Sequence, residues 1–427
     1  MRLRIEKAIY GGAGLARHEG KAIFVPFTLP GEDVEAHVVQ DKGGYATAEL
    51  DTVAEPSAQR AAAPCRHFGE CGGCHYQHAD NATQVALKAG ILREALERAR
   101  IREIPEIAAV TGEPLGYRNR IRLHVAANPF RLCYKLRNSH EDLAIGECPI
   151  AAPVLQKAIE AVHRDGASLG LDEWIREIEF FTDSDGAAML VSLWTKRPAL
   201  DAERRLKDLW PRLLQIVPQA VGAAVSSAED GRGLSRRLTQ IGEGSVRWRM
   251  GALEYRVSLG SFFQVNRFLI ERLVDLVAGG EQGVGAWDLY AGVGLFSVPL
   301  AERFGEVTAV ESAAGSVRDL HENLRGTKHR VVALETASFL GRAVAGGHVA
   351  PDLVVVDPPR SGLGRSVTTA LGKLRPPRIT YVSCDPATLS RDLAALLESG
   401  YRLRKMHLVD LFPQTFHLES VTHLALE

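Results

Sequence analysis

Cys384 is the residue of this chain whose type and position most favour covalent chemistry. It follows an apolar, strand-like run at 378–383 and comes just before a helical pattern. Asp385 suits the capping position of that helix, and Pro386 suits its first turn. A sulfur at a helix N-terminus is expected to favour the thiolate, the form that acts as a nucleophile. A lone cysteine is more often a buried structural residue, so the neighbouring motifs must decide.

A glycine motif upstream of Cys384 predicts a cofactor that carries a nucleoside. Gly292 and Gly294 stand between a strand-like and a helix-like run, where glycine lets a ligand approach the backbone. The next strand-like run ends in Glu311, whose carboxylate can accept hydrogen bonds from a ribose diol. NAD favours G-x-G-x-x-G, and position 297 is Ser. Asp288 at the start of the motif suits S-adenosylmethionine better, although a tight structural turn is an alternative.

Asp357 ends a further strand-like run and is followed by two prolines and Arg360. Strand ends in a parallel sheet line the ligand crevice. The prolines predict a rigid loop there, which could hold a flat base against the methyl donor. A plain rigid turn is the simpler interpretation.

Four of the six cysteines have a spacing that suits a metal centre. They are Cys65, Cys71, Cys74 and the distant Cys148. Four thiolates can hold either zinc or a [4Fe–4S] cluster. Structural zinc sites usually show paired C-x2-C knuckles, whereas here three cysteines are bunched and the fourth is remote. This favours iron–sulfur, while nearby histidines keep zinc open. Cys133 has no predicted role.

A basic stretch at 117–137 is a candidate surface for nucleic acid. It contains six Lys or Arg residues and no Asp or Glu, and aromatic residues alternate with them. Basic residues suit phosphates, and aromatic rings suit unpaired bases. Arg118 and Arg120 are therefore predicted RNA contacts. A solvated charged face is the alternative.

The order of strand-like and helix-like patterns predicts three parts. Residues 1–55 contain short strands with glycine turns, typical of a small barrel. Residues 56–254 form a central α+β unit that holds the cysteines, and a helix at 81–101 is expected to pack on the catalytic part. From 255 to 427 strands and helices alternate, which predicts an α/β fold with a doubly wound, mostly parallel sheet.

The composition sets limits on the class of protein. The 427 residues are 46% hydrophobic and carry a formal net charge of −1, so any surface for nucleic acid must be local. The first residues lack the apolar core of a signal peptide, and no apolar run is long enough to span a membrane. We therefore expect a cytoplasmic protein, and nothing in the sequence requires more than a monomer.

Taken together, these motifs resemble the RNA uracil-5 methyltransferase family, specifically its iron–sulfur branch, which modifies 23S ribosomal RNA. The resemblance covers nearly the whole chain. Besides the cysteines, it is carried by Y-R-N-R at 117–120, S-F-F-Q-V-N at 261–266, D-L-Y-A-G-V-G at 288–294, D-P-P-R at 357–360, S-C-D-P-A-T-L at 383–389 and F-P-Q-T-F-H-L-E at 412–419. The family usually has a cysteine where this chain has Ala291, a position that is not catalytic.

The resemblance implies a role for individual residues. Cys384 would attack C6 of a uracil, and Glu419 would remove the C5 proton after methyl transfer. Phe262 would stack on the extruded base, whereas Phe263 is expected in the core. The implied S-adenosylmethionine contacts are Gln264, Tyr290, Glu311 and Asp357. The N-terminal barrel would be a TRAM domain, an RNA-binding module, and the central part would be an iron–sulfur domain.

Three other functions compete with methylation of ribosomal RNA. The same chemistry could act on transfer RNA, although transfer-RNA enzymes of this family commonly lack the cysteines. A radical S-adenosylmethionine enzyme can also combine a cluster with a TRAM module, but four cysteine ligands leave no open iron site. A non-catalytic RNA-binding protein with a methyltransferase fold is the third, and the presence of both Cys384 and Glu419 argues against it.

Overall fold

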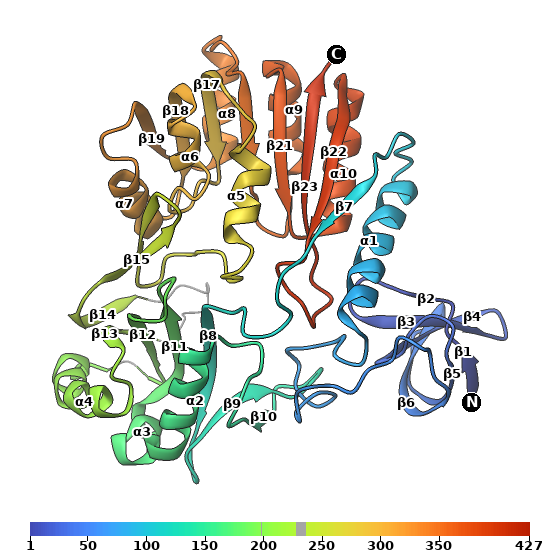
Figure 1. The fold of residues 1–427 in the computed structure, drawn as a ribbon, viewed down its shortest axis with the longest axis vertical. Helices are drawn as coiled ribbons and strands as arrows, with labels where there is room; N and C mark the ends of the chain where they lie inside the picture. The colour runs from blue at the N-terminus through green and yellow to red at the C-terminus, as the bar shows by residue number, and fades with distance from the viewer. Residues whose placement is uncertain (198, 228–235) are drawn as a thin grey trace.

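The computed structural model describes residues 1–197, 199–227 and 236–427, which form three parts around the loop 410–418 (Figure 1). The N-terminal strands, a central sheet and a larger C-terminal sheet with its helices make up these parts. None of the described helices is both long enough and apolar enough to cross a membrane.

The N-terminal part is a curled sheet of six strands in the order β1-β5-β6-β4-β3-β2. The strands are β1 Arg2–Arg4, β2 Lys7–Ala8, β3 Ala13–His18, β4 Lys21–Pro26, β5 Asp33–Asp41 and β6 Tyr45–Glu55. Alternate residues such as Ile23 and Val25 point into one core, as the two-residue period of a strand requires. Register shifts between β5 and β6 bend the sheet. The predicted small barrel is thus present as a half-barrel.

The central part contains a seven-stranded sheet in the order β10-β9-β8-β11-β12-β13-β14. Its strands are β8 Arg120–Ala126, β9 Arg131–Lys135, β10 Asp142–Ala144, β11 Ile175–Thr182, β12 Met189–Thr195, β13 Ala220–Ser226 and β14 Arg237–Gly242. The helices are α2 Pro153–Asp165, α3 Leu171–Trp174 and α4 Ala202–Ile216, with a 3-10 helix at Gly166–Leu169. A hairpin of β15 Ser245–Met250 and β16 Leu253–Ser258 follows and packs into the core of the C-terminal part.

The C-terminal part is an eight-stranded sheet in the order β19-β18-β17-β20-β21-β23-β22-β7. Its strands are β17 Gly283–Leu289, β18 Phe304–Glu311, β19 His329–Ala333, β20 Leu353–Val356, β21 Arg378–Ser383, β22 Tyr401–Val409, β23 Glu419–Leu426 and β7 Ile107–Val110. Its helices are α5 Ile270–Ala278, α6 Ser297–Ala301, α7 Ala314–Asn323, α8 Thr336–Ala345, α9 Gly364–Leu374 and α10 Pro386–Glu398. Only β23 pairs antiparallel with its neighbours.

The short strand β20 explains why helices cover both faces of this sheet. Its four residues are all apolar and fully buried. Leu353 and Val355 join a core with α5, α6 and α7, whereas Val354 and Val356 join a second core with α8, α9 and α10. Successive strand residues point to opposite faces, so an unbroken apolar run needs a helical layer on each side. The expected doubly wound α/β arrangement is present as this mixed sheet.

Two elements from the segment 56–254 attach to the C-terminal sheet. Helix α1, Asn81–Arg98, is capped by the Asp80 carboxylate, which accepts a hydrogen bond from Thr83 N at 2.7 Å. Its Leu92 and Leu96 share a core with Leu393 of α10. Strand β7 pairs with β22 and extends the sheet by one strand. Figure 1 shows both beside the last strands of the chain.

Candidate active site

The candidate site lies where the order of the parallel strands reverses, between β17 and β20. Ligands bind outside the carboxyl ends of strands at such a point, because the connections there diverge to opposite sides. Tyr290 follows β17, Glu311 ends β18, Asp357 follows β20 and Cys384 follows β21. Four residues predicted from separate motifs therefore meet at one edge of the sheet.

The register of β21 and β23 places Glu419 beside Cys384. Ser383 pairs with Ser420 across the antiparallel ladder, so the next positions along the two strands are Cys384 and Glu419. Because β23 runs opposite to its neighbours, its first residue lies at the edge where the parallel strands end. The side chain of Glu419 is buried, with 4% of the residue exposed. The pairing of these two strands thus places the predicted nucleophile next to the predicted base.

The glycine loop has the backbone conformation that its residue types allow. Gly292 and Gly294 have φ values of 57° and 94°, in the left-handed region that glycine enters without strain. A Cβ on Gly294 would lie 2.8 Å from Cδ1 of Leu320, so the Leu320 side chain of α7 would have to move. A Cβ on Gly292 would have no atom within 4 Å outside its chain neighbours. The loop can therefore accept a ligand close to the Gly292 backbone.

Glu311 is held in place by backbone donors around this loop. Its Oε2 accepts a hydrogen bond from Gly292 N at 2.8 Å, and its Oε1 accepts one each from Ser312 N and Ala313 N at 2.7 Å. Asp288, which opens the motif, is fully buried, and burial raises its pKa to about 7. Ser297 donates a hydrogen bond to it. The acidic residues of the motif are thus fixed before any ligand binds.

Asp357 and Glu419 form a pair of poorly solvated carboxyl groups. Burial raises the pKa of Asp357 to about 7, and the nearby Asp288 adds to this effect. Burial, and then the charge of Asp357, hold the pKa of Glu419 well above its ordinary value, while Arg360 opposes the change. A carboxylate with a raised pKa is a stronger base. The environment of Glu419 therefore suits removal of a proton.

The expected thiolate at Cys384 is not favoured by its surroundings. Asp385 does cap α10, but its Oδ1 accepts hydrogen bonds from Ala387 N and Thr388 N at 3.0 and 2.9 Å. The cap carboxylate, not the sulfur, thus uses these free donors of the helix. Burial first, and then Glu419 and Asp357, raise the pKa of Cys384 to about 12, whereas Arg360 lowers it. The prediction of a helix-stabilised thiolate was wrong for this reason.

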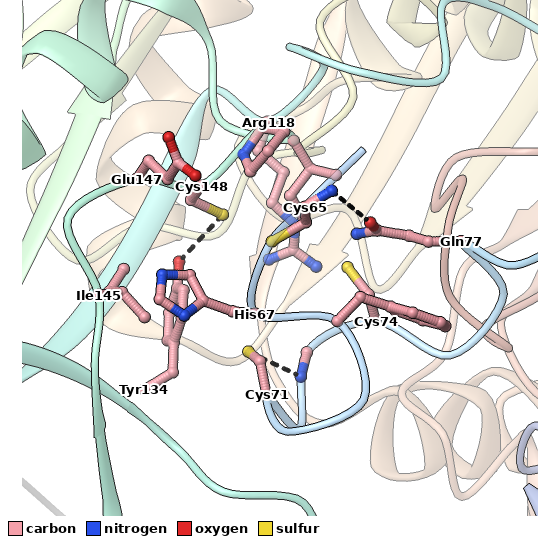
Figure 2. Close-up of a pocket in the computed structure, with 14 residues that line it drawn as sticks. Cys65, His67, Cys71, Cys74, Gln77, Arg118, Tyr134, Ile145, Glu147 and Cys148 are labelled. Atoms are coloured by element: carbon pink, nitrogen blue, oxygen red, sulfur yellow. Dashed lines mark hydrogen bonds between the residues drawn. The ribbon is translucent and has the colours of Figure 1, made fainter. Parts of the chain in front are cut away.

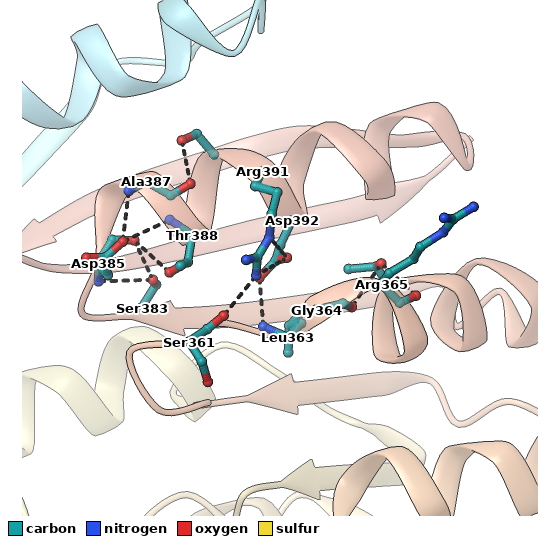
Figure 3. A network of polar contacts seen from close by, with 12 residues as sticks. Ser361, Leu363, Gly364, Arg365, Ser383, Asp385, Ala387, Thr388, Arg391 and Asp392 are labelled. Carbon is teal, nitrogen blue, oxygen red and sulfur yellow. Dashed lines mark hydrogen bonds and ion pairs between the residues drawn. The ribbon is translucent and has the colours of Figure 1, made fainter.

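Asp392 of α10 joins the loop after Asp357 to the helix that follows Cys384 (Figure 3). Its Oδ2 accepts hydrogen bonds from Leu363 N at 2.7 Å and from the Tyr381 hydroxyl at 2.9 Å. Arg391 donates to Asp392 and to Ser361 O, the latter at 2.9 Å. The carboxylate is almost wholly buried, so these bonds hold the two loops in a fixed relative position.

The segment 261–266 places two neighbouring phenylalanines in opposite environments. Phe262 is 62% exposed, whereas Phe263 is 2% exposed and its ring lies 5.2 Å from that of Trp248. This agrees with Phe263 as a core residue and leaves Phe262 available to a ligand. Gln264 is buried, and its backbone carbonyl accepts a hydrogen bond from Asn119 Nδ2 at 2.8 Å.

The four predicted ligand cysteines line one cavity of about 90 Å³ (Figure 2). Cys65, Cys71 and Cys74 come from the loop before α1, and Cys148 comes from the loop before α2. Burial raises the pKa of all four thiols. In the described part of the chain, no three His, Cys, Asp or Glu side chains converge closely enough to hold a single metal ion.

Two hydrogen bonds in this cavity end on sulfur atoms. The Tyr134 hydroxyl donates to Cys148 Sγ at 3.7 Å, and Gly73 N donates to Cys71 Sγ at 3.4 Å. Arg118 also lines the cavity, and its Nε is a buried donor without a hydrogen-bond partner in the structure. The cavity therefore combines four sulfurs with a cation and polar donors.

The predicted RNA contacts Arg118 and Arg120 are not on an open surface. Arg118 lies in the wall of the cysteine cavity. Arg120 stacks over the ring of Phe181 at 4.2 Å, pairs with Glu179 at 3.9 Å, and has 15% of its side chain exposed. The basic stretch lacks acids of its own, but β8 pairs with β11, which supplies Glu179. Pairing between strands thus gives Arg120 an acidic partner that the basic stretch itself lacks, and RNA contact by Arg118 and Arg120 stays a prediction.

Other residues at the site carried no predicted role. Arg360 and His417 belong to quoted motifs, and their side chains meet at 3.2 Å. His75 follows Cys74 in the chain, and its ring lies 4.6 Å from that of Phe416 in the loop 410–418. Tyr10 of the N-terminal part reaches the backbone of Cys384. Arg360 and His417 could have been predicted, because they belong to motifs already quoted. The sequence around Tyr10 contains no motif that indicates a role at the site.

Comparison with known families and proteins agrees with this arrangement. Residues 344–426 match the tRNA (Uracil-5-)-methyltransferase family, and residues 1–50 match the TRAM domain. A 23S rRNA (uracil(1939)-C(5))-methyltransferase RlmD from Klebsiella pneumoniae is 34% identical over 96% of this chain and 92% of its own length. An RNA methyltransferase from Aquifex aeolicus is 33% identical over 99% and 98% of the two chains.

The fold also matches a solved structure along its whole length. The tRNA (uracil-54, C5)-methyltransferase of Pyrococcus abyssi, in complex with S-adenosyl-L-homocysteine, has a TM-score of 0.77 and 24% identity, and the match covers 100% of both chains. This likeness supports the fold, while the sequence relatives establish the family. The chain belongs to the RNA uracil-5 methyltransferase family and is an S-adenosylmethionine-dependent RNA methyltransferase with an N-terminal TRAM domain.

Proposed function

We propose that this enzyme methylates C5 of a specific uridine in 23S ribosomal RNA through a covalent bond between Cys384 and the uracil ring. The position of Cys384 next to Glu419 in the β21–β23 register carries the proposal. The names of full-length relatives at 31–34% identity support ribosomal RNA.

The proposed reaction uses the two residues in sequence. The Cys384 thiol gives up its proton to solvent, its sulfur forms a bond to C6 of the uracil, and the resulting enolate makes C5 nucleophilic. C5 then takes the methyl group, which S-adenosylmethionine supplies from a positively charged sulfur. Glu419 removes the proton from C5, and the electron pair of that C–H bond re-forms the C5–C6 double bond as the Cys384 sulfur leaves. Every bond made to the enzyme is broken again, so one turnover restores Cys384.

The remaining predicted site residues would bind the cofactor and the base. Glu311 would accept hydrogen bonds from the ribose hydroxyls of the cofactor. The backbone at Gly292 and Gly294 would leave room for the cofactor. Gln264, Tyr290 and Asp357 would complete the cofactor contacts. Phe262, with 62% exposure, would stack on the base after its extrusion from folded RNA.

We also propose that Cys65, Cys71, Cys74 and Cys148 hold a [4Fe–4S] cluster. The four soft sulfur donors line one cavity. A single zinc ion with Zn–S bonds of about 2.3 Å needs its four cysteine sulfurs roughly 3.8 Å apart. A [4Fe–4S] cluster would hold its four cysteine sulfurs further apart than this. The hydrogen bonds to Cys71 and Cys148 and the buried Arg118 would stabilise the negative charge of a thiolate-bound cluster. Its role would be structural, because methyl transfer requires no electron.

Transfer RNA is the second candidate substrate. The matched family model and the Pyrococcus abyssi protein both carry transfer-RNA names. The chemistry at Cys384 would be the same. The choice between the two substrates depends on surfaces outside the catalytic residues.

Substitution of Cys384 and Glu419 should stop the reaction at different stages. We expect Cys384→Ala to give neither methylated product nor covalent RNA adduct. Glu419→Gln should accumulate a methylated adduct that survives denaturing gels, because the nucleophile has attacked but the C5 proton remains. Cys133→Ala and Glu427→Gln are matched controls outside the site and should turn over normally. Normal turnover by Glu419→Gln would remove Glu419 as the base.

The reactivity of Cys384 should depend on pH in a way set by its neighbours. Because its pKa is raised to about 12, the thiolate fraction is small at neutral pH. The rate of alkylation by iodoacetamide should therefore rise about tenfold per pH unit between pH 7 and 9. The rise should continue beyond pH 8.5, about where the rate for a free cysteine levels off. Glu419→Gln should speed alkylation at alkaline pH and Arg360→Gln should slow it. Peptide mass spectrometry identifies the site, and a plateau below pH 9 would contradict the expectation.

The metal content of the protein tests the proposed cluster. Protein purified without oxygen should be brown and contain ~4 iron and ~4 sulfide per chain. Cys148→Ala should lose most of both, whereas Cys133→Ala, which changes a cysteine outside the cavity, should keep them. A colourless protein with one zinc per chain would assign the four cysteines to zinc instead.

The RNA substrate can be identified in cells. We expect mass-spectrometric mapping of RNA from a strain that lacks the gene to show loss of one 5-methyluridine in 23S ribosomal RNA. Transfer RNA should keep its 5-methyluridine, and the wild-type gene should restore the lost site. Loss from transfer RNA alone would assign the enzyme to that substrate.

A further inference from the structure

Tyr10 connects the TRAM domain to both catalytic loops. It lies in the turn between β2 and β3, and its hydroxyl donates a hydrogen bond to the backbone carbonyl of Cys384 at 3.4 Å. Its ring meets that of Phe416 edge to face, with centroids 5.4 Å apart and an interplanar angle of 88°. Phe416 lies three positions before Glu419. One side chain therefore contacts the peptide of the nucleophile and the loop that leads to the base.

A second set of contacts holds the same turn in place. Gly12 has a φ of 92°, and a Cβ there would lie 3.0 Å from Cβ of His75. His75 packs on the other contact of Tyr10, the Phe416 ring, at 4.6 Å. The backbone N–H groups of His75 and Tyr76 both donate to Gln414 O, at 2.8 and 3.0 Å. The turn, the cysteine segment and the loop 410–418 thus meet at one junction.

The surroundings of Tyr10 keep its hydroxyl protonated. Burial first, and then the charge of Asp385, raise its pKa above the ordinary value for tyrosine, and Cys384 adds to the effect. Arg360 acts in the opposite direction. The hydroxyl is therefore a donor throughout the physiological pH range, and it can serve the Cys384 carbonyl at any pH where the enzyme works.

Small displacements matter at a nucleophile. A hydrogen bond to the Cys384 carbonyl restrains the peptide plane between Cys384 and Asp385, and with it the positions available to the sulfur. A misplacement of about 1 Å can cost roughly 100-fold in rate. The ring contact with Phe416 restrains the other loop in the same way. Both restraints come from the TRAM domain, which lies more than 370 positions earlier in the chain.

We propose that Tyr10 is a positioning residue for methyl transfer, through which the TRAM domain sets the relative placement of Cys384 and Glu419. The TRAM domain then contributes to the rate of the chemical step as well as to RNA affinity. The inference rests on the proposed roles of Cys384 and Glu419.

Two substitutions of Tyr10 separate the hydrogen bond from the ring contact. Tyr10→Phe keeps the ring on Phe416 and removes the donor, and Tyr10→Ala removes both. With saturating RNA that the wild type methylates, we expect the single-turnover rate to fall about fivefold for Tyr10→Phe and roughly 100-fold for Tyr10→Ala. The Kd for RNA should change less than about twofold for Tyr10→Phe, because this donor is already bonded to the protein backbone.

A second measurement isolates attack by the sulfur. On RNA that contains 5-fluorouridine, the adduct accumulates because the base cannot remove fluorine from C5. Its rate of formation should fall in Tyr10→Phe. Tyr45 offers a matched control in the same domain, since its ring packs on Phe24 at 5.5 Å. Tyr45→Phe and Tyr45→Ala should keep the wild-type single-turnover rate, and thermal unfolding checks that each variant folds.

The possible outcomes distinguish the inference from the proposed function. If both Tyr10 variants keep the wild-type rate at saturating RNA and change only the Kd, Tyr10 belongs to the RNA-binding surface and the proposal is overturned. An unchanged rate of adduct formation in folded Tyr10→Ala would overturn it as well. If Cys384→Ala still forms adduct, the assigned nucleophile fails instead, whatever the Tyr10 variants do.

Discussion

The buried ion pair between Lys88 and Asp410 is the constraint on which the geometry of the active site depends. Lys88 Nζ lies 2.6 Å from Asp410 Oδ1, and the two side chains are 0% and 1% exposed. An unpaired charge in the interior is strongly unfavourable. Each residue therefore requires the other, and α1 is held against the start of the loop 410–418.

The rest of that loop is held by helix α1 and by Tyr117, just before β8. Lys88 also donates to Phe412 O at 2.9 Å, and the Tyr117 hydroxyl donates to Pro413 O at 3.1 Å. Gln414 N donates to the side chain of Gln84 in α1 at 2.8 Å. Figure 1 shows the loop extending from the sheet into the space where the three parts meet. Because Glu419 follows directly, the position of the base depends on contacts made far from the catalytic strands.

The catalytic edge of the sheet contains poorly solvated groups. Burial first, and then neighbouring carboxylates, raise the pKa of Asp357, Cys384 and Glu419. The raised values suit Glu419 as a base, but they work against the thiolate form of Cys384. Arg360 is the cation that opposes this effect at both Cys384 and Glu419. The charge balance of the site is therefore set by residues from three separate segments of the chain.

Local patterns in the sequence were enough for the fold class and for the motifs that meet at the sheet edge. The apolar run of β20 required two helical layers, the glycines predicted the cofactor loop, and Asp385 predicted the cap of α10. These depend on neighbours in the chain, which a sequence displays directly. The thiolate state of Cys384 was predicted wrongly, because burial and the carboxylates of Glu419 and Asp357 raise the pKa of this thiol across space.

The sequence by itself determined which residue types are available for chemistry and which strand ends carry them. Only the tertiary structure decided which of them share an environment. Strand register placed Glu419 beside Cys384, and an ion pair over more than 300 positions placed the loop that leads to it. The turn with Tyr10 reached the same site from the other end of the chain. Burial and long-range charge alter a pKa through distances in space, and those distances are fixed only when the three parts pack together.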